Sequence, residues 1–184
     1  MTIGTLALRL TVGGLMAGHG LQKLNGSFGG PGMEGTTQMM EKLGMHPADQ
    51  HARAVALSET VGGALTAAGF LSPLGPAMIT GTMAVAIAKV HAKNGPWVTK
   101  GGFEYNLTLI AAALALAGEG PGVLSIDGIR RKQRRGSQWA FAAAALGLGA
   151  AAATMKVAER SAPPAPAGTP AAAGTDQAAA TAEG

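Results

Sequence analysis

The sequence predicts an all-α integral membrane protein built as a four-helix transmembrane bundle. Charged residues make up only 13% of the 184 residues and hydrophobic residues reach 47%, a balance far from that of an ordinary soluble domain. Four apolar segments each approach the roughly 20 residues that a helix needs to cross a bilayer. Glycine, with 29 residues, is also more frequent in membrane helices than in soluble ones. We therefore expect a multi-pass protein of the cell membrane, with the lipid bilayer as its surroundings.

The four predicted spans follow one another along the first two thirds of the chain. They cover residues 3–24, 52–71, 76–92 and 103–118. Pro76 suits the first turn of the third span, because the N–H that proline lacks has no helical partner there. The connection Ser72-Pro73-Leu74-Gly75 is so short that the second and third spans must form an antiparallel hairpin. Together the four spans define a membrane domain over residues 3–128.

The first loop, residues 25–50, is the long one and contains the stretch TTQMMEKLGMHP. We expect a short helix there, with Met39, Met40 and Leu43 on one side. Two interpretations stay open for it: a helix at the membrane interface, or a solvated loop helix. Small residues within the spans let helix backbones approach closely and favour a packed bundle over isolated anchors; they include the glycines at positions 13, 14, 18, 20, 62 and 63.

The chain changes character after the fourth span. The run RRKQRR, Arg130–Arg135, places five basic residues in six positions. Beside an apolar segment such a run is typical of a flank attracted to anionic lipid, so we expect a cytoplasmic loop over residues 129–136 and no nucleic-acid partner. The alanine-rich segment 137–157, with Gln138–Met155 as its apolar part, is marginally hydrophobic, and a fifth span stays open. Residues 158–184, rich in Pro, Ala, Gly and Thr, are expected to be disordered.

Several kinds of chemistry are excluded by what the sequence lacks. The chain has no cysteine, which excludes disulfides, thiol redox chemistry and cysteine-ligated metal sites. Histidine and carboxylate side chains suit several metals, but no Glu-x-x-His pair is present, and we expect no metal site. The first eight residues lack the positively charged start of a signal peptide, so the first apolar segment is expected to remain as a span.

Polar residues of the spans converge on one half of the bilayer, because successive spans reverse direction. The candidate polar pocket consists of His19, Lys23, Glu59, His91, Glu104 and Asn106, with Lys89 and Tyr105 at the same depth. Arg9 precedes Lys23 by roughly 21 Å along a helix and must lie on the opposite side. Little besides Arg9 and Glu119 is expected on that side.

Glu59 is the most informative member of this pocket. An ionisable group at membrane depth is costly and normally faces a partner or a wet cavity. Glu59 shares a helix face with Gly62, Gly63 and Thr66, which must look into the bundle, and we expect His19 and Lys23 to meet it there. A structural role, in which the polar residues only hold two helices together, stays equally open. Lys23 and Lys89 could each be interface anchors.

Four stretches, in this order, resemble the DoxX family of small bacterial membrane proteins: LALRLTVGGLMAGHGLQKL, LGMHP, ETVGGALTAAGF and GGFEYNLTLIAAALALAGEGPGVLSID. The resemblance covers Leu6–Asp127. It implies a four-helix transmembrane bundle in a bacterial inner membrane, and the family's recurrent polar positions match Arg9, His19, Lys23, Glu59 and Glu104. Some relatives are subunits of a thiosulfate:quinone oxidoreductase, and others are linked to oxidative-stress complexes with soluble partners.

The resemblance and the pocket together favour a redox-associated membrane subunit that binds a quinone or a small anion. Such a protein would belong to an oxidoreductase complex, with soluble redox enzymes as partners. The alternative is a non-enzymatic membrane scaffold or a small-solute transport component. The sequence leaves the substrate and reaction open. Because four spans separate the amino terminus from Arg130–Arg135, both are predicted to be cytoplasmic.

Overall fold

The computed structural model describes residues 2–163, and every regular element in that range is a helix. The prediction of an all-α protein is thus confirmed for these residues. The long helices are α1 (Ile3–Asn25), α3 (Ala48–Ala68), α4 (Leu74–Ala86), α5 (Glu104–Glu119) and α7 (Ser137–Arg160). The short ones are η1 (Ser27–Gly29), α2 (Gly32–Lys42), η2 (Ile87–His91), η3 (Ala92–Asn94), η4 (Val98–Lys100) and α6 (Ile126–Ile129). The disorder predicted for the tail falls, from residue 164 onward, outside the described residues.

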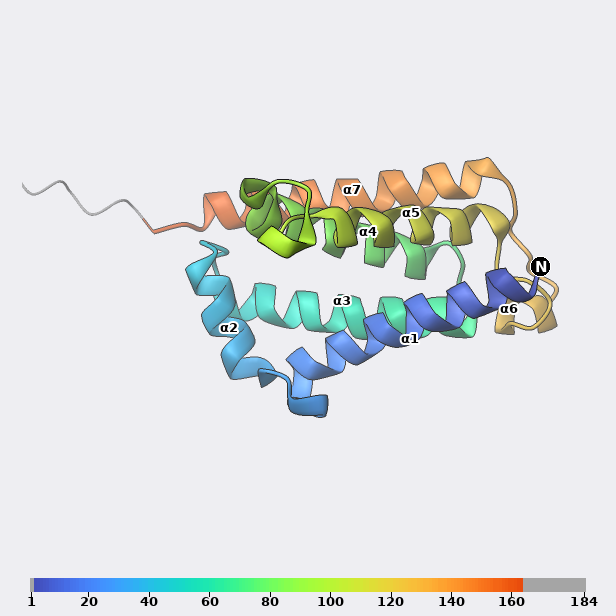
Figure 1. Cartoon of the computed structure of the whole chain (residues 1–184), viewed down its shortest axis with the longest axis horizontal. Coiled ribbons are helices and arrows are strands. Elements are labelled where there is room, and N and C mark those ends of the chain that lie inside the picture. The colour runs from blue at the N-terminus through green and yellow to red at the C-terminus, as the bar shows by residue number, and fades with distance from the viewer. Residues whose placement is uncertain (1, 164–184) are drawn as a thin grey trace, which may run out of the picture.

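The long helices form two layers, as Figure 1 shows. Helices α1 and α3 lie side by side in one layer, while α4, α5 and α7 form the other. Helix α2 caps one end of the bundle, and α6 lies at the opposite end together with the amino terminus. The two ends are therefore distinct, and the polar residues divide between them.

Glycines bring α1 and α3 into backbone contact. A Cβ added to Gly63 would lie 2.6 Å from the carbonyl oxygen of Gly13, and one added to Gly20 would collide with Thr60. Such close approach lets membrane helices pack by van der Waals contact. It also fixes the height of Lys23 on α1 relative to Glu59 on α3, because the two helices can slide little against each other.

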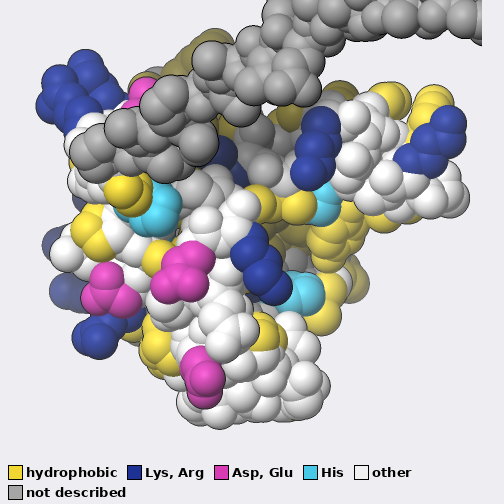
Figure 2. Space-filling model, turned by 90° about the vertical axis from the view of Figure 1, so that its left-hand side faces the viewer, with side chains coloured by type: hydrophobic (Ala, Val, Ile, Leu, Met, Phe, Trp, Pro, Cys, Tyr) yellow, Lys and Arg dark blue, Asp and Glu magenta, His cyan; other side chains and the backbone are white. Residues whose placement is uncertain are grey.

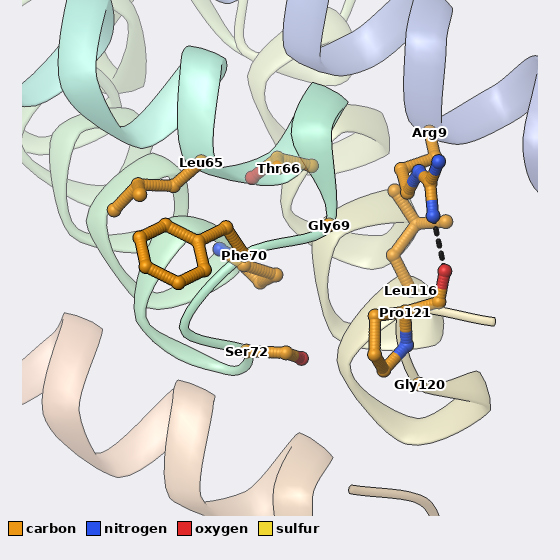
Figure 3. A pocket seen from close by; sticks show the side chains of 10 residues that line it. Arg9, Leu65, Thr66, Gly69, Phe70, Ser72, Leu116, Gly120 and Pro121 are labelled. Atoms are coloured by element: carbon orange, nitrogen blue, oxygen red, sulfur yellow. Dashed lines mark hydrogen bonds between the residues drawn. The ribbon is translucent and has the colours of Figure 1, made fainter. Parts of the chain in front are cut away.

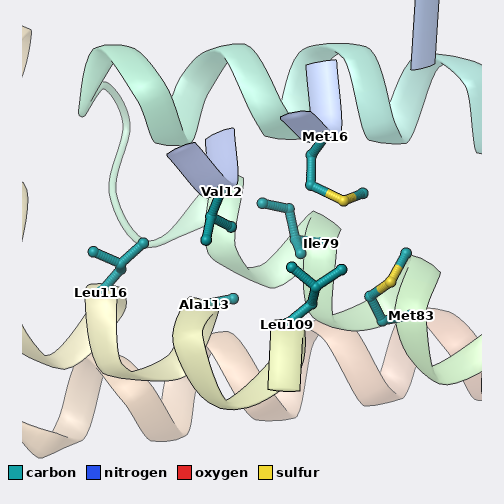
Figure 4. Close-up of a cluster of buried hydrophobic side chains, with 7 residues drawn as sticks. All are labelled: Val12, Met16, Ile79, Met83, Leu109, Ala113 and Leu116. Atoms are coloured by element: carbon teal, nitrogen blue, oxygen red, sulfur yellow. The ribbon is translucent and has the colours of Figure 1, made fainter. Parts of the chain in front are cut away.

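A cluster of buried apolar side chains joins the two layers (Figure 4). Val12 and Met16 of α1 meet Ile79 of α4 and Leu109 of α5 there. The cluster is completed by Met83, Ala113 and Leu116. It occupies the middle of the bundle and separates the polar groups of one end from those of the other.

Helix α7 is an integral part of the second layer. It packs against α4 and α5, and a Cβ added to Gly147 would lie 2.6 Å from the carbonyl oxygen of Ala77. The helix extends to Arg160, beyond the predicted segment 137–157. Among the described helices, α7 is the one that is long and apolar enough by composition to cross a membrane. The bundle thus has five long helices, where the sequence predicted four and left the fifth open.

The third predicted span is divided in the structure. Helix α4 ends at Ala86, and residues Ile87–His91 continue it as a π-helix, η2. Such wider turns inside α-helices are rare and occur frequently at functional sites. In η2, Lys89, Val90 and His91 all face the same cavity.

Candidate functional site

Glu59 and Lys23 form an ion pair between α3 and α1. The Glu59 residue is only 4% exposed, and Lys23 Nζ donates to its Oε2 at 2.5 Å. The Lys23 side chain is itself 18% exposed, so the pair lies at the edge of the bundle interior. The pairing compensates a buried charge that would otherwise be very costly. It is positioned by the glycine contacts that hold α1 against α3.

His19 lies one turn before Lys23 on the same helix. Its side chain is exposed, and its Nδ1 lies 3.0 Å from Oε1 of Gln22. His19 lines the same cavity as Lys23 and Glu59. The structure therefore places it beside the ion pair but gives it a different hydrogen-bond partner.

The remaining candidate residues divide into two groups. Nδ1 of His91 donates to the carbonyl oxygen of Gly101 at 2.7 Å, and Nδ2 of Asn106 donates to Sδ of Met83 at 3.4 Å. Both residues line the cavity. Glu104 does not: its Oε1 accepts a hydrogen bond from the backbone N–H of Val98 at 2.7 Å. Glu104 thereby orders the loop before α5.

The cavity has a volume of about 680 Å³ and is lined by all five long helices, by η2 and by α2. Six methionines contribute to its predominantly apolar wall: Met16, Met39, Met40, Met45, Met78 and Met83. Methionine is flexible and fills irregular space, so such a wall can adapt to a ligand. The polar lining comes from His19, Lys23, His51, Ser58, Glu59, Thr82, Lys89, His91, Tyr105, Asn106 and Thr154. This size and mixture of groups are those of a small-molecule site.

Helix α2 forms the roof of this cavity. Met39, Met40 and Leu43, which the sequence placed on one side of a short helix, all line it. The buried side chains of Met40 and Met45 pack with Ala52 of α3 and Ala158 of α7. Figure 2 looks onto this end of the molecule, where acidic, basic and histidine side chains gather.

The opposite end contains a second polar cluster, built around Arg9. The guanidinium of Arg9 donates to the carbonyl oxygens of Pro121, shown in Figure 3, and of Leu124, the latter at 2.6 Å. Within residues 2–163 no carboxylate lies within 4.0 Å of Arg9. The adjoining cavity measures about 20 Å³, room for about one water molecule.

Asp127 belongs to this second cluster, and the sequence analysis missed it. It is 3% exposed, and its Oδ2 accepts a hydrogen bond from the backbone N–H of Ser72 at 3.0 Å. Nη1 of Arg134 donates to the carbonyl oxygen of Ser72 at 2.7 Å. The expectation that little besides Arg9 and Glu119 lies at this end was therefore wrong. Ser125 caps α6 by accepting a hydrogen bond from the backbone N–H of Gly128, but no local sequence pattern indicates the contact of Asp127 with Ser72.

No group of three or more His, Asp or Glu side chains that could hold a metal ion comes together among residues 2–163. The ion pair involves one carboxylate, and the cavity histidines lie on three different elements. The site is therefore described by its ion pair and its apolar volume.

Comparison with known proteins agrees with the first three of the four stretches that resemble the DoxX family, whereas the fourth, residues 101–127, lies beyond the match. A family model described as DoxX matches residues 4–92. The match covers α1 to the end of η2 and so contains Lys23, Glu59 and Lys89, while Asn106 and α7 lie beyond it. No curated protein and no solved structure matches the chain. Over residues 4–92 the chain is therefore similar to the DoxX family.

Proposed function

We propose that this protein crosses the membrane with all five long helices. Support comes from the outer surface of the bundle, where large apolar side chains are exposed: Leu8, Leu10, Leu15, Leu57, Val61, Leu107, Phe141 and Leu148. Extensive apolar exposure marks a surface that contacts lipid or another protein. The 23 residues of α1 extend about 35 Å, enough for a hydrocarbon core of about 30 Å.

The amino terminus and Arg130–Arg135 are proposed to face the cytoplasm. Both lie at the α6 end of the bundle (Figure 1), so one orientation satisfies both. A reporter fused after Arg135 should then read as cytoplasmic. A reporter fused after Arg160 should read as exported if α7 spans. Inverted readings at both positions would overturn the orientation, and identical readings would show that α7 does not span.

The cavity is proposed to bind a quinone. The observation that carries this proposal is the Lys23–Glu59 ion pair in the wall of a largely apolar cavity of about 680 Å³. A quinone has an apolar body and carbonyl oxygens that accept hydrogen bonds. Lys23, Lys89 and Asn106 carry donors on this wall. These groups could hold the headgroup while the methionines contact the ring.

In this function the protein is the membrane subunit of an oxidoreductase complex. Reduction of a quinone to a quinol takes up two electrons and two protons. A soluble reductase partner would supply the electrons. His19 is exposed and Glu59 is buried in the same cavity, so protons could pass from solvent through His19 and Glu59 to the headgroup. In the alternative, a scaffold or solute-transport component, the ion pair only joins α1 to α3.

Quinone titration of the purified protein in lipid nanodiscs tests the proposal. The wild type should bind saturably, and Lys23→Met or Glu59→Gln should weaken binding at least about tenfold, the effect of losing a charged hydrogen bond. Glu119→Gln is the matched control, because Glu119 is exposed and lies outside the cavity. Absence of saturable binding, or equal binding by all variants, would favour the scaffold alternative.

A further inference from the structure

The cavity is polar at one end and apolar along the rest of its length. Its lining follows the third predicted span from Lys89 in η2 back to Leu74 at the start of α4. These residues are separated by roughly 22 Å along a helix axis. Beyond Thr82 the α4 lining consists of Leu74, Ala77, Met78 and Gly81. The cavity thus has a long apolar arm that leads away from the ion pair.

Helix α7 forms the other wall of this arm. Leu146, Ala150, Ala151 and Thr154 line the cavity. Helices α4 and α7 run parallel, and Gly147 contacts the backbone of Ala77 and Gly81. Leu146 therefore lines the arm, while the small side chains at 150, 151 and 154 lie level with Thr82 and beyond it, where the arm joins the polar end. This wall lies outside the region that matches the DoxX family model, residues 4–92.

The arm opens at the side of the bundle. Leu74 is 43% exposed and Leu146 is 57% exposed, although both line the cavity. In a protein that crosses the membrane, this side faces hydrocarbon. A ligand with a long apolar chain could therefore enter from the bilayer, with its chain in the arm and its head at the ion pair.

We propose that the arm binds a single long hydrocarbon chain and that α7 determines which chain length the protein accepts. The ligand class is an amphiphile with one compact polar head and one apolar chain. The assignment of a quinone as head rests on the proposed function, whereas the chain-binding arm rests on the polarity and opening of the cavity. Ala150 is the specificity-determining position, because it lies where the arm joins the polar end and a large side chain there would close the arm to the chain.

The experiment compares two benzoquinones in nanodiscs of fixed lipid content, one with a single isoprene unit and one with four. The wild type should bind the long-chain quinone at least tenfold more tightly. Ala150→Phe should abolish this preference and leave the affinity for the short-chain quinone unchanged. Ala152→Phe is the control, because Ala152 is exposed like Ala150 and lies on the same helix but does not line the cavity. Ala150→Leu replaces the Phe variant if the latter fails to fold.

A second measurement separates this inference from the proposed function. It measures displacement of a fluorescent long-chain fatty acid by palmitate. Displacement that Ala150→Phe abolishes, with no quinone binding, would support the chain-binding arm and overturn the quinone proposal. Quinone binding that is indifferent to chain length or to Ala150→Phe would overturn the arm. Binding of neither probe would overturn both.

Discussion

The two ends of the bundle each contain a buried charged residue, but the two residues differ in their partners and in the size of the adjoining cavity. At one end Arg9 donates to backbone carbonyl oxygens of the loop after α5, beside a cavity of about 20 Å³. At the other end Glu59 is paired with one lysine side chain, beside a cavity of about 680 Å³. Backbone partners and close packing indicate a structural role for Arg9. A side-chain partner and open volume indicate a site at Glu59.

Substitution of Arg9 should have the largest effect on stability. Arg9→Met removes two hydrogen bonds from a charged donor, each worth about 1.5–3 kcal/mol, so we expect a loss of about 4 kcal/mol. No second side-chain substitution can rescue it, because the acceptors are backbone carbonyls. Thermal unfolding in detergent measures the effect, with Lys132→Met, an exposed residue of the same end, as control. If Arg9→Met unfolds at the same temperature as the wild type, the structural role of Arg9 is contradicted.

Substitution of Lys23 should be rescued by a second substitution. Lys23→Met leaves the Glu59 carboxylate buried without its partner and should cost about 3 kcal/mol. The double variant Lys23→Met with Glu59→Leu should regain most of that stability, since an apolar pair replaces the ion pair, but it should not regain quinone binding. Unfolding and binding are measured on the same preparations. Recovery of both stability and quinone binding in the double variant would show that the Lys23–Glu59 pair has only a structural role, as proposed for Arg9.

A substitution that pushes the backbone of α1 away from that of α3 should lower both stability and ligand binding at the cavity end. Gly63→Ala places a Cβ 2.6 Å from the carbonyl oxygen of Gly13 and should cost about 2 kcal/mol by overpacking. It should also weaken binding, because the Lys23–Glu59 contact lengthens. Gly14→Ala is the matched control, since a Cβ there meets no heavy atom within 4 Å. Equal stability of the two variants would contradict the close helix contact.

The smallest effect is expected midway between the ends, at Thr80. Its hydroxyl is fully buried and has no hydrogen-bond partner within residues 2–163. Thr80→Val should therefore stabilise the protein by about 1 kcal/mol, because the unpaired polar atom is removed. Thr66→Val serves as the contrast, since the Thr66 hydroxyl donates to the carbonyl oxygen of Gly62 at 2.8 Å. A loss of stability in both variants would show that Thr80 has a partner.

The positions of most helices could be predicted because apolar content and length are local properties. The first span differs from α1 only at its last residue, 24 against 25. Helix α3 begins at Ala48, before the predicted residue 52, because its first turn contains Asp49 and Gln50 and a hydropathy pattern stops short of polar turns. The π-helix η2 was not predicted, since its hydrogen bonds follow from how the helix end packs.

The candidate site could be predicted in part. Direction and depth along antiparallel helices were enough to bring Lys23 near Glu59. Whether the group acts as a site stays a prediction. Glu104 was assigned to the pocket by its depth alone, yet its carboxylate accepts a hydrogen bond from the backbone N–H of Val98 in the preceding loop and does not line the cavity. The contact of Asp127 with Ser72 bridges 55 residues, and no local pattern contains such information.

The π-helix η2 gives three consecutive residues, Lys89, Val90 and His91, a place on one cavity wall. Successive side chains diverge by about 100° in an α-helix and by a smaller angle in the wider π-helix. The winding of η2 therefore sets the directions in which Lys89 and His91 leave the backbone, in addition to their side-chain type. A scan by single substitutions would leave that winding unchanged. Removal of one residue, such as the exposed Ala88, would instead rewind the turn and rotate Lys89 and His91 relative to the rest of the site.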